Sequence, residues 1–241
     1  MQIRVVDIEE YFDQIARLWV ICFPEDDLEY VNYYIKHRLV ENKAYCFACF
    51  DDTNIVSMIN VIHQQTYCNN LSVTIPSGFI VGVCTHPNYR RKGLSAELMR
   101  YLCAFYCENK IVSILQLSTQ IPKFYEKLGF TRYSEYCPCR YLDKYSGRDT
   151  LILHAKDISQ EIARDLLLCY IKNAKDGFFK KDEKNIIQMA FLYDEVRVCV
   201  TNDGNYDMWM FYDKTYENET TYQMVKYLTV SIPLEQNTEN Y

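Results

Sequence analysis

Apolar residues recur every three or four positions near the start of the chain, a period that is typical of amphipathic helices. Ile8, Ile15 and Trp19 fall on one face of such a helix. The Asp7–Glu10 segment has the Asp-x-x-Glu pattern that often begins one, so we expect the helix from Asp7 onward. The same spacing predicts a second helix over residues 28–39.

Continuous or alternating apolar runs predict the strands of one sheet. They cover residues 1–6, 45–50, 55–65, 77–85, 111–117 and 130–136. Leu94, Leu98 and Leu102 lie on one face of a long helix before the strand at 111–117, and a short helix follows that strand. This order of strands and helices predicts an α/β fold.

The second half of the chain repeats the opening order of elements without clear residue identity. We expect strands at 150–155, 195–201, 206–212 and 221–230 and helices at 157–171 and 178–192. An Asp-Gly hairpin turn at 202–205 joins two of the strands. We therefore expect one domain over residues 1–145 and a partial copy of it over residues 146–241.

Composition narrows the function classes. The chain has 241 residues, of which 49% are hydrophobic, so a substantial core can be buried. The formal net charge is −6, whereas a nucleic-acid binder is normally basic, so we expect no nucleic-acid partner. Residues 1–7 lack the apolar region of a signal peptide, and no stretch is apolar and long enough to span a bilayer, so we expect no membrane partner.

The 11 cysteines lie mostly inside apolar periodic runs, which is typical of buried, reduced thiols in a cytoplasmic protein. Cys137 and Cys139, with Cys68 and His154 elsewhere, could be imagined as a metal site. A Cys-x-Cys pair without a matching second pair is a poor zinc site, so we expect no metal.

A basic loop, Arg90–Ser95, joins the strand at 77–85 to the long helix. The first turn of a helix carries N–H groups without intrahelical partners, and the helix dipole adds partial positive charge there. Gly93 has no Cβ to keep a ligand away from those amides. The loop therefore predicts a phosphate or pyrophosphate site.

The spacing of Arg90, Gly93 and Ser95 is neither a Walker A loop nor the dinucleotide Gly-x-Gly-x-x-Gly pattern. It resembles the Gln/Arg-x-x-Gly-x-Gly/Ala pyrophosphate loop of the GCN5-related N-acetyltransferase (GNAT) family, with Ser95 where glycine or alanine is usual. Phe124–Phe130 reads Phe-Tyr-x-Lys-Leu-Gly-Phe, which resembles the second hallmark of that family. The resemblance covers roughly residues 1–136.

This resemblance implies the GNAT acyl-CoA N-acyltransferase fold, an α/β fold with a single mixed (α+β) sheet, and acetyl-CoA as co-substrate. It also implies that the pantetheine arm pairs with the strand before the loop, and that amides at the start of the long helix hold the pyrophosphate. The residues expected at the cofactor are Val83, Cys84, Thr85, Arg90, Arg91, Lys92, Gly93, Leu94, Ser95, Ala96, Thr119 and Gln120.

Tyr125 matches the tyrosine of the second hallmark, and the resemblance implies that it is the general acid that protonates the departing thiolate. The general base stays open, because residues 77–85 contain no Asp or Glu. His63, His86, a relayed water or the acceptor itself could take the proton. In the enhanced-intracellular-survival (Eis) type of GNAT enzyme the C-terminal carboxylate does so, here that of Tyr241.

Other polar residues leave alternatives open. Cys84 and His86 could form a nucleophile and base for a ping-pong route, yet the cofactor arm is expected on that face of the strand. Asp26, Asp27 and Glu29 could recognise a cationic acceptor or form a solvated charge run.

The second part lacks the basic loop. No glycine after Gly129 lies in a basic strand-to-helix turn, so residues 146–241 are expected to bind no coenzyme A. Tandem halves of this kind, together with the segment 176–183, resemble the Eis type, in which a degenerate domain follows an active one. An exposed sheet edge in the second part would be a natural interface for a homo-oligomer.

We therefore expect an N-acetyltransferase that moves an acetyl group from acetyl-CoA to a primary amine of a small molecule or peptide, by direct attack in a ternary complex. The alternative is a coenzyme A-binding regulatory or interaction module without transfer activity. The missing strand carboxylate and the cofactor-free second part favour that alternative, whereas Tyr125 and the intact loop favour the enzyme.

Overall fold

The computed structural model describes residues 1–241 apart from 69–71, 137–148, 176, 215–217 and 229–241. The strands are β1 (Gln2–Val6), β2 (Tyr45–Asp51), β3 (Asn54–Cys68), β4 (Val73–Thr85), β5 (Ile114–Thr119), β6 (Thr131–Tyr136), β7 (Thr150–Leu153), β8 (Glu195–Val200), β9 (Tyr206–Tyr212) and β10 (Thr221–Tyr227). The helices are α1 (Phe12–Cys22), α2 (Leu28–Tyr34), the π-helical η1 (Ile35–Val40), the 3-10 turn η2 (Pro87–Tyr89), α3 (Leu94–Asn109), α4 (Pro122–Glu126), the 3-10 turn η3 (Ala155–Asp157), α6 (Gln160–Asn173) and α7 (Glu183–Ala190).

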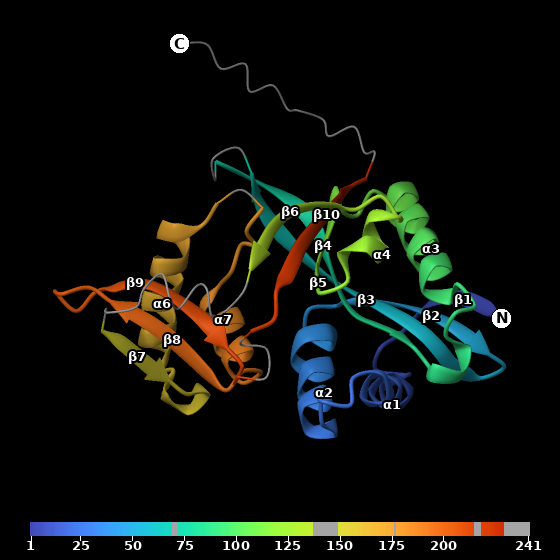
Figure 1. The fold of residues 1–241 in the computed structure, drawn as a ribbon, viewed down its shortest axis with the longest axis horizontal. Coiled ribbons are helices and arrows are strands. Elements are labelled where there is room, and N and C mark those ends of the chain that lie inside the picture. Colours follow the sequence, from blue (N-terminus) through green and yellow to red (C-terminus); the bar gives the residue numbers. More distant parts are fainter. Residues whose placement is uncertain (69–71, 137–148, 176, 215–217, 229–241) are drawn as a thin grey trace, which may run out of the picture.

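These strands form two sheets that lie side by side (Figure 1). The larger sheet has the order β1-β2-β3-β4-β5-β10-β6, in which β4 and β5 are parallel and the other neighbours antiparallel. The smaller sheet has the antiparallel order β7-β8-β9. The expected α/β fold with a mixed sheet is confirmed.

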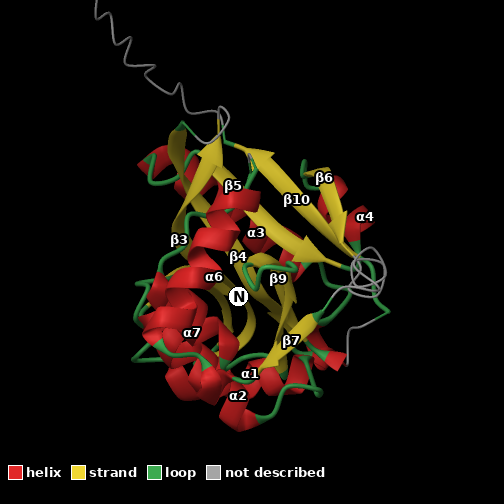
Figure 2. Cartoon of the chain, turned by 90° about the vertical axis from the view of Figure 1, so that its left-hand side faces the viewer, coloured by secondary structure: helices red, strands yellow, loops and turns green. Residues whose placement is uncertain are grey.

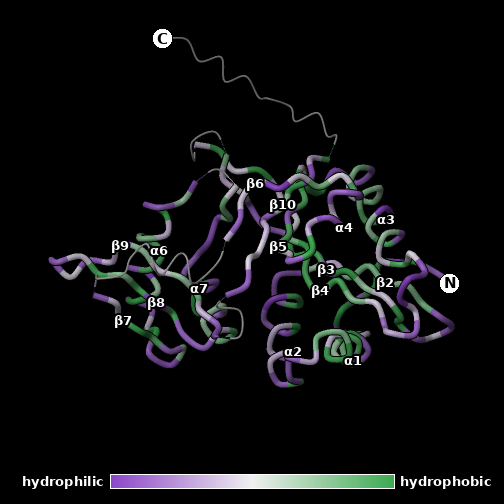
Figure 3. Tube along the Cα trace, viewed as in Figure 1, coloured by the Kyte–Doolittle hydropathy of each residue, from purple (hydrophilic) through white to green (hydrophobic). Residues whose placement is uncertain are grey.

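Helices cover both faces of the larger sheet. α1 and α2 lie on one face and α3 and α4 on the other (Figure 1). In β2, Phe47 packs in the core under α3, whereas Cys46 and Ala48 pack in the core under α1. Since successive strand residues point to opposite faces, a strand buried on both faces reads as a continuous apolar run. Figure 3 shows hydrophobic segments in α1 and in the central strands.

The first helix begins later than expected. The carboxylate of Asp7 accepts hydrogen bonds from the backbone N–H groups of Glu9 and Glu10, at 2.8 and 3.2 Å. These bonds close a separate turn, which competes with the first helical turn. α1 therefore begins at Phe12, and Trp19 lies on its buried face.

The helix expected over residues 28–39 changes its winding part-way. Asp27 caps α2 by accepting from the N–H of Tyr30 at 2.8 Å. The chain then continues as the π-helical η1, which carries Arg38. A π-helical turn shifts the side chains that follow it, and such turns are frequent at functional sites.

β4 and β5 are paired over only part of their length, and β4 continues toward the basic loop without β5. Their described pairing joins Ser77–Phe79 to Ile114–Gln116, and β4 then continues to Thr85 away from β5. A bulge in the pairing of β3 with β4 places Gly82 at a φ of 55°. A Cβ at Gly82 would lie 2.5 Å from the ring of Trp19, so this close approach requires glycine.

β10 lies in the larger sheet, between β5 and β6. The expected assignment of this strand to the second part is wrong, because the apolar pattern identifies a strand but not its neighbours. Met224 is fully buried in the core under α3, and Lys226 donates to the carbonyl of Leu128 at 2.6 Å. The expected boundary between residues 145 and 146 lies outside the described residues.

The smaller sheet has its own core. α6 and α7 lie side by side over it (Figures 1 and 2). Leu166 of α6, Ile186 of α7 and Val198 of β8 are fully buried in this shared core. Strand, two helices and two strands therefore follow one another as expected, with the first strand paired to the second, as β1 is to β2.

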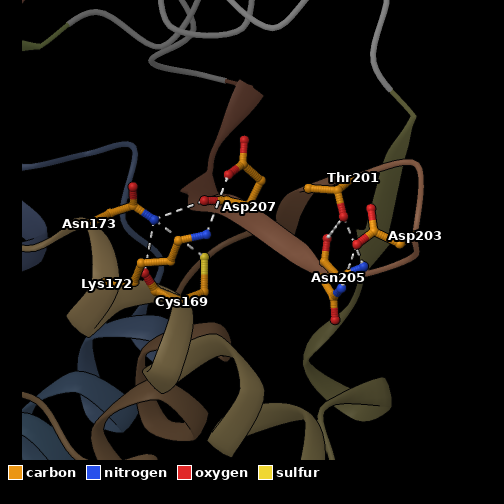
Figure 4. Close-up of polar contacts among 7 residues, drawn as sticks. All are labelled: Cys169, Lys172, Asn173, Thr201, Asp203, Asn205 and Asp207. Carbon is orange, nitrogen blue, oxygen red and sulfur yellow. Dashed lines mark hydrogen bonds and ion pairs between the residues drawn. The ribbon is translucent and has the colours of Figure 1, made fainter.

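Polar side chains fix the start of β9 from two directions (Figure 4). The hydroxyl of Thr201 donates to the carbonyl of Asn205 at 3.2 Å, across the hairpin turn that the sequence predicts. The amide of Asn173 on α6 donates to the carbonyl of Asp207 at 2.8 Å. The turn and the neighbouring helix thereby hold the strand in register.

Residues 177–180 pair with the open edge of β3, where the sequence predicts a helix. Backbone hydrogen bonds of 2.7 to 2.9 Å join this segment to Gln65 and Tyr67. Asp182 then caps α7, which begins later than expected, at Glu183. The segment that attaches the smaller part to the larger sheet is thus extended rather than helical.

Candidate active site

The turn from β4 into α3 shapes the basic loop. His86 accepts through Nδ1 from the N–H of Asn88 at 3.3 Å, at the start of η2. Arg91 and Gly93 then adopt positive φ angles of 63° and 81°. Gly93 is the N-cap residue of α3, and a Cβ there would meet no described heavy atom within 4 Å. The space in front of the helix is therefore open to a ligand.

A chain of hydroxyl groups ties this loop to the sheet. Ser57 donates to the carbonyl of Cys84 at 2.8 Å, and Thr85 lies 2.7 Å from both the Ser57 and the Ser95 hydroxyls. Because Ser57 uses its one proton on the carbonyl, Thr85 donates to Ser57 and Ser95 donates to Thr85. Ser95 thus anchors the first turn of α3, which accounts for a hydroxyl where the family usually has glycine or alanine.

A cavity of about 220 Å³ lies against the loop. Its lining residues are Thr85, Tyr89, Arg90, Arg91, Gly93, Leu94, Ser95, Ala96 and Phe124. The unpaired amides at the start of α3, the helix dipole and two guanidinium groups all favour an anion in this position. The cavity is suited to phosphate groups.

Tyr89 and Phe124 line this cavity, although neither was among the residues expected at the cofactor. The hydroxyl of Tyr89 donates to the carboxylate of Asp51 at 2.5 Å, and the ammonium of Lys92 lies 4.7 Å from the Tyr89 ring centroid. Lys92, an expected cofactor residue, therefore packs on an aromatic ring beside the cavity. The sequence signal for Tyr89 was an aromatic residue directly before Arg90.

Four more expected cofactor residues lie outside the lining. Val83 and Cys84 precede the cavity in β4, where Cys84 is buried. Thr119 accepts from the N–H of Ile121 at 3.1 Å, and Gln120 donates to a glutamate of the segment before β10. Thr119 and Gln120 thus shape the segment that leads into α4.

Tyr125 lies on α4 with 7% of its surface exposed. Its ring packs edge-on against Phe124 and Phe130, with centroids 4.9 and 5.9 Å apart. Burial raises the pKa of Tyr125 to about 12, and the neighbouring Cys84 adds to this effect. Its hydroxyl makes no hydrogen bond within the described part of the chain. The phenol therefore stays protonated at neutral pH and can donate to a ligand.

Both histidines considered as bases make structural contacts. Nε2 of His63 lies 2.8 Å from the hydroxyl of Tyr106, the ring packs edge-on against Tyr45, and burial lowers its pKa. His86 shapes the turn through Nδ1. Tyr241, whose carboxylate was a further candidate, lies outside the described residues.

Two cysteines meet beside the end of β4. Burial raises the pKa of the Cys84 thiol well above its ordinary value, which makes Cys84 a poor nucleophile. Sγ of Cys22 lies 3.4 Å from the carbonyl oxygen of Thr85, and Arg90 donates to the same carbonyl at 3.1 Å. A hydrogen bond from Cys84, followed by Arg90, lowers the pKa of Cys22 to about 6 against the opposing effect of burial.

The acidic residues between α1 and α2 divide into different roles. Asp27 caps α2, and Glu29 is exposed on the first turn of that helix. Asp26 accepts from Nε1 of Trp19 at 2.8 Å, and burial raises the pKa of its carboxyl. Because Trp19 packs on the bulge at Gly82, Asp26 is linked to the part of β4 that is not paired with β5.

Two further expectations concern features away from this site. Cys137 and Cys139 lie outside the described residues, and the described ones form no group of three or more potential metal ligands. No helix in the described ranges combines the length and apolar character that crossing a membrane requires.

The sequence and the fold of this chain are similar to those of known proteins. The family model described as acetyltransferase (GNAT) domain matches residues 2–133. No curated protein matches the chain. A conserved protein from Enterococcus faecalis V583, described as a probable N-acyltransferase, aligns with 95% of this chain and 73% of its own, at 14% identity and a TM-score of 0.64.

Two more solved structures share the fold. A GCN5-related N-acetyltransferase from Anabaena variabilis ATCC 29413 aligns with 94% of this chain and 73% of its own, at 13% identity and a TM-score of 0.62. Eis1 from Mycobacterium abscessus aligns with 90% of this chain and 60% of its own, at 11% identity and a TM-score of 0.59. At these identities the similarity concerns the fold.

Proposed function

The chain belongs to the GNAT acetyltransferase family, and on that basis we propose that it transfers an acetyl group from acetyl-CoA to a primary amine of a small molecule or peptide. The observation that carries this proposal is the open, anion-attracting cavity at the start of α3, which follows the part of β4 that is not paired with β5. An opening between these strands, followed by an anion site, matches a long thioester with a pyrophosphate at its far end.

The residues around the cavity fit coenzyme A. Gly93 leaves the space before the α3 amides open, and Arg90 and Arg91 supply charge for the phosphates. The part of β4 from Val83 to Thr85 has no pairing with β5, so its backbone groups can pair with the amide groups of the pantetheine arm. Thr119 and Gln120 stay expected contacts on the other side of the opening.

When bound, acetyl-CoA supplies a thioester whose carbonyl carbon accepts the amine nitrogen as its carbon–sulfur bond breaks. Tyr125 donates its phenolic proton to the departing sulfur, which a pKa of about 12 permits across the physiological range. The amine attacks directly in a ternary complex, because the buried thiol of Cys84 is unsuited to a covalent route.

We assign the acceptor side to Asp26. Its raised pKa suits a carboxylate that receives a proton from an ammonium substrate, and its bond to Trp19 fixes it near the bulge of β4. Asp27 is engaged in capping α2. Asp26 thus takes the place of the carboxylate that β4 lacks.

The smaller sheet with α6 and α7 is proposed to be a degenerate, cofactor-free copy of the first part, as in the Eis type. The antiparallel order β7-β8-β9, with two helices between its first and second strands, supports this. We also propose a domain division between residues 145 and 146, with β10 assigned to the first domain. A cytoplasmic location is proposed as well, as is a homo-oligomer that uses the edge of this sheet.

Calorimetric titration of acetyl-CoA is the first test. We expect micromolar binding by the wild type and its loss in Gly93→Glu, because a carboxylate would enter the anion cavity. Gly204→Glu is the matched control, since Gly204 also has a positive φ and open space around it but lies in the β8–β9 turn. Equal loss in both variants, or no binding by the wild type, would contradict the proposal.

A panel of primary amines then tests transfer, with coenzyme A release measured by chromatography, because the chain's own thiols react with thiol reagents. Consumption of acetyl-CoA that depends on an amine supports the enzyme. The second candidate, a coenzyme A-binding module without transfer activity, is favoured by the missing carboxylate on β4. Tight binding without turnover across the panel would establish that alternative.

A further inference from the structure

A second cavity, of about 250 Å³, lies where the two parts of the chain meet. η1 contributes Arg38 to its lining, β3 contributes Gln64, and the segment before α7 contributes Lys180, Lys181 and Asp182. It is separate from the cavity at the basic loop, because the two linings share no residue. The proposed acetyl transfer uses none of these groups.

Two residues of this lining carry buried donor atoms without partners. Nε of Arg38 and Nε2 of Gln64 are buried and have no hydrogen-bond partner among the described residues. A buried donor without a partner costs free energy, so such groups in folded proteins normally have a bound partner. Both groups donate and neither accepts, which specifies an acceptor-rich ligand.

The charges of the cavity point the same way. Burial, followed by the cationic Arg38, lowers the pKa of Lys181 to about 8, so its ammonium is mostly protonated at pH 7. Neither Arg38 nor Lys181 has an ion pair with a described carboxylate. Asp182, the carboxylate in the lining, accepts from the N–H of Asn185 at 2.7 Å to cap α7. His63, also in the lining, is kept neutral by burial, which lowers its pKa.

We propose that this second cavity binds a small oxyanion, a molecule that carries a phosphate or carboxylate group, through Arg38, Gln64 and Lys181. Its volume lies below the roughly 300–1,000 Å³ of pockets that hold drug-sized ligands, so the ligand is small. Charge-assisted hydrogen bonds from a guanidinium and an ammonium suit a phosphate or carboxylate in this position.

Such a ligand joins the two parts of the chain. Arg38 and Gln64 belong to the larger part, whereas Lys181 follows the segment 177–180 that pairs with the edge of β3. The same border holds a salt bridge of 2.7 Å between Lys184 and Glu41. An anion bound between the cations removes their mutual repulsion and strengthens this attachment.

Calorimetry of the full chain tests the site with two probes, inorganic phosphate and succinate, against sodium chloride at equal ionic strength. We expect one of the two probes to bind and the double variant Arg38→Gln/Lys181→Gln to bind it at least about tenfold more weakly. Lys36→Gln is the control, because Lys36 is exposed on the same helical segment and its removal changes the charge without changing the cavity. Phosphate binding alone identifies a phosphate-bearing ligand, and succinate binding alone a carboxylate.

The basic loop is a competing anion site, so the same titration is made with Gly93→Glu. Binding that survives Gly93→Glu and is lost in the double variant supports the proposal, whether or not acetyl-CoA binds at the loop. A second measurement needs no variant: the probe should slow hydrogen exchange at residues 35–42 and 177–185 of the wild type. Protection confined to residues 90–96, equal affinity in wild type and double variant, or no binding of either probe would overturn the proposal.

Discussion

The side chain of Tyr125 combines a buried ring with a hydroxyl that is bound to no described group. Burial raises its pKa to about 12, so the phenol carries its proton at every pH below that value. A proton donor must be protonated to act, so the donor is lost only as the pH rises through about 12. We expect no alkaline fall in rate from Tyr125 below about pH 11.

Tyr125→Phe removes the proposed donor and leaves the packing of the ring. We expect kcat to fall by about 10²–10⁴-fold, the range typical of general acid–base catalysis, with acetyl-CoA affinity unchanged. Tyr101→Phe on α3 is the control, because Tyr101 is 40% exposed. Steady-state kinetics and calorimetry check the pair. Full activity in Tyr125→Phe would remove the role that we assign to it.

Cys22 is the thiol that we expect to react first. Its pKa of about 6 means that it is mainly thiolate at pH 7, and alkylation requires the thiolate. The rate of labelling by iodoacetamide should rise with pH to a plateau above a midpoint near 6. Mass spectrometry of peptides measures it, with Cys103, whose pKa burial raises, as the internal comparison. Labelling of Cys103 before Cys22 at pH 7 would show that Arg90 and Cys84 do not activate Cys22.

Functional residues that belong to fixed motifs could be predicted from the sequence, whereas those whose role depends on packing could not. Gly93 and Tyr125 were found because their spacing is tied to chemistry. Asp26 was not separated from Asp27, since a single position decides which of them caps α2 and which meets Trp19. Cys22 had no sequence signal, because Arg90 is far from it along the chain.

At the scale of elements, the bulge at Gly82 lies in the part of β4 that follows its pairing with β5, which ends at Phe79. Gly82 accommodates the ring of Trp19 through both a positive φ and the absence of a Cβ. Trp19 in turn donates to Asp26, so the bulge, α1 and the loop after α1 form one connected support. The geometry of the proposed acceptor side therefore depends on a residue that carries no polar side chain.

Gly82→Ala should be clearly destabilising. We expect a loss of about 2 kcal/mol or more, because the new methyl group overlaps the Trp19 ring and the backbone must keep a positive φ. In a chain of this size that corresponds to a fall in Tm of about 4–8 °C. Gly204→Ala carries the same backbone cost in open space, so the difference between the two variants isolates the overlap.

Scanning calorimetry measures both variants. Equal falls in Tm would mean that the Trp19 ring can move aside, and that the bulge does not need glycine for space. A larger fall in Gly82→Ala, with weaker binding of amine acceptors, would link the bulge to the acceptor side.

Most elements followed from apolar periodicity, and the errors share a cause. The carboxylate of Asp7 accepts hydrogen bonds within a turn, and the backbone groups of residues 177–180 pair with the edge of β3. Neither segment therefore forms part of a helix. In both cases a local pattern compatible with a helix met a competing hydrogen-bond partner. For residues 177–180 that partner is β3, which lies far along the chain, where a single sequence does not reveal it.

At the scale of the whole molecule, the two sheets are not separate along the chain. β10 leaves the smaller part and enters the larger sheet between β5 and β6. Periodicity identified it as a strand, but long-range pairing is decided by which edges other elements leave open. β5 and β6, which α4 joins, lie on either side of β10, and each is antiparallel to it.

Two buried methionines test this arrangement. Met224→Ala on β10 should increase hydrogen exchange in β5 and β6 and leave β8 unchanged, because a cavity at a fully buried methionine costs about 2–5 kcal/mol where it packs. Met208→Ala on β9, also buried, should do the reverse. Exchange measured by mass spectrometry separates the two, and a Met224→Ala effect confined to the smaller sheet would contradict the pairing of β10.

The position of β10 also sets the timing of maturation on the ribosome. A nascent chain that has emerged through β6 carries the basic loop and Tyr125, but its catalytic sheet still has a gap where Thr221–Tyr227 will lie. That gap exposes two unpaired strand edges to other nascent chains until synthesis is almost complete. A message truncated within the smaller part would therefore yield an aggregation-prone product rather than a working half-enzyme.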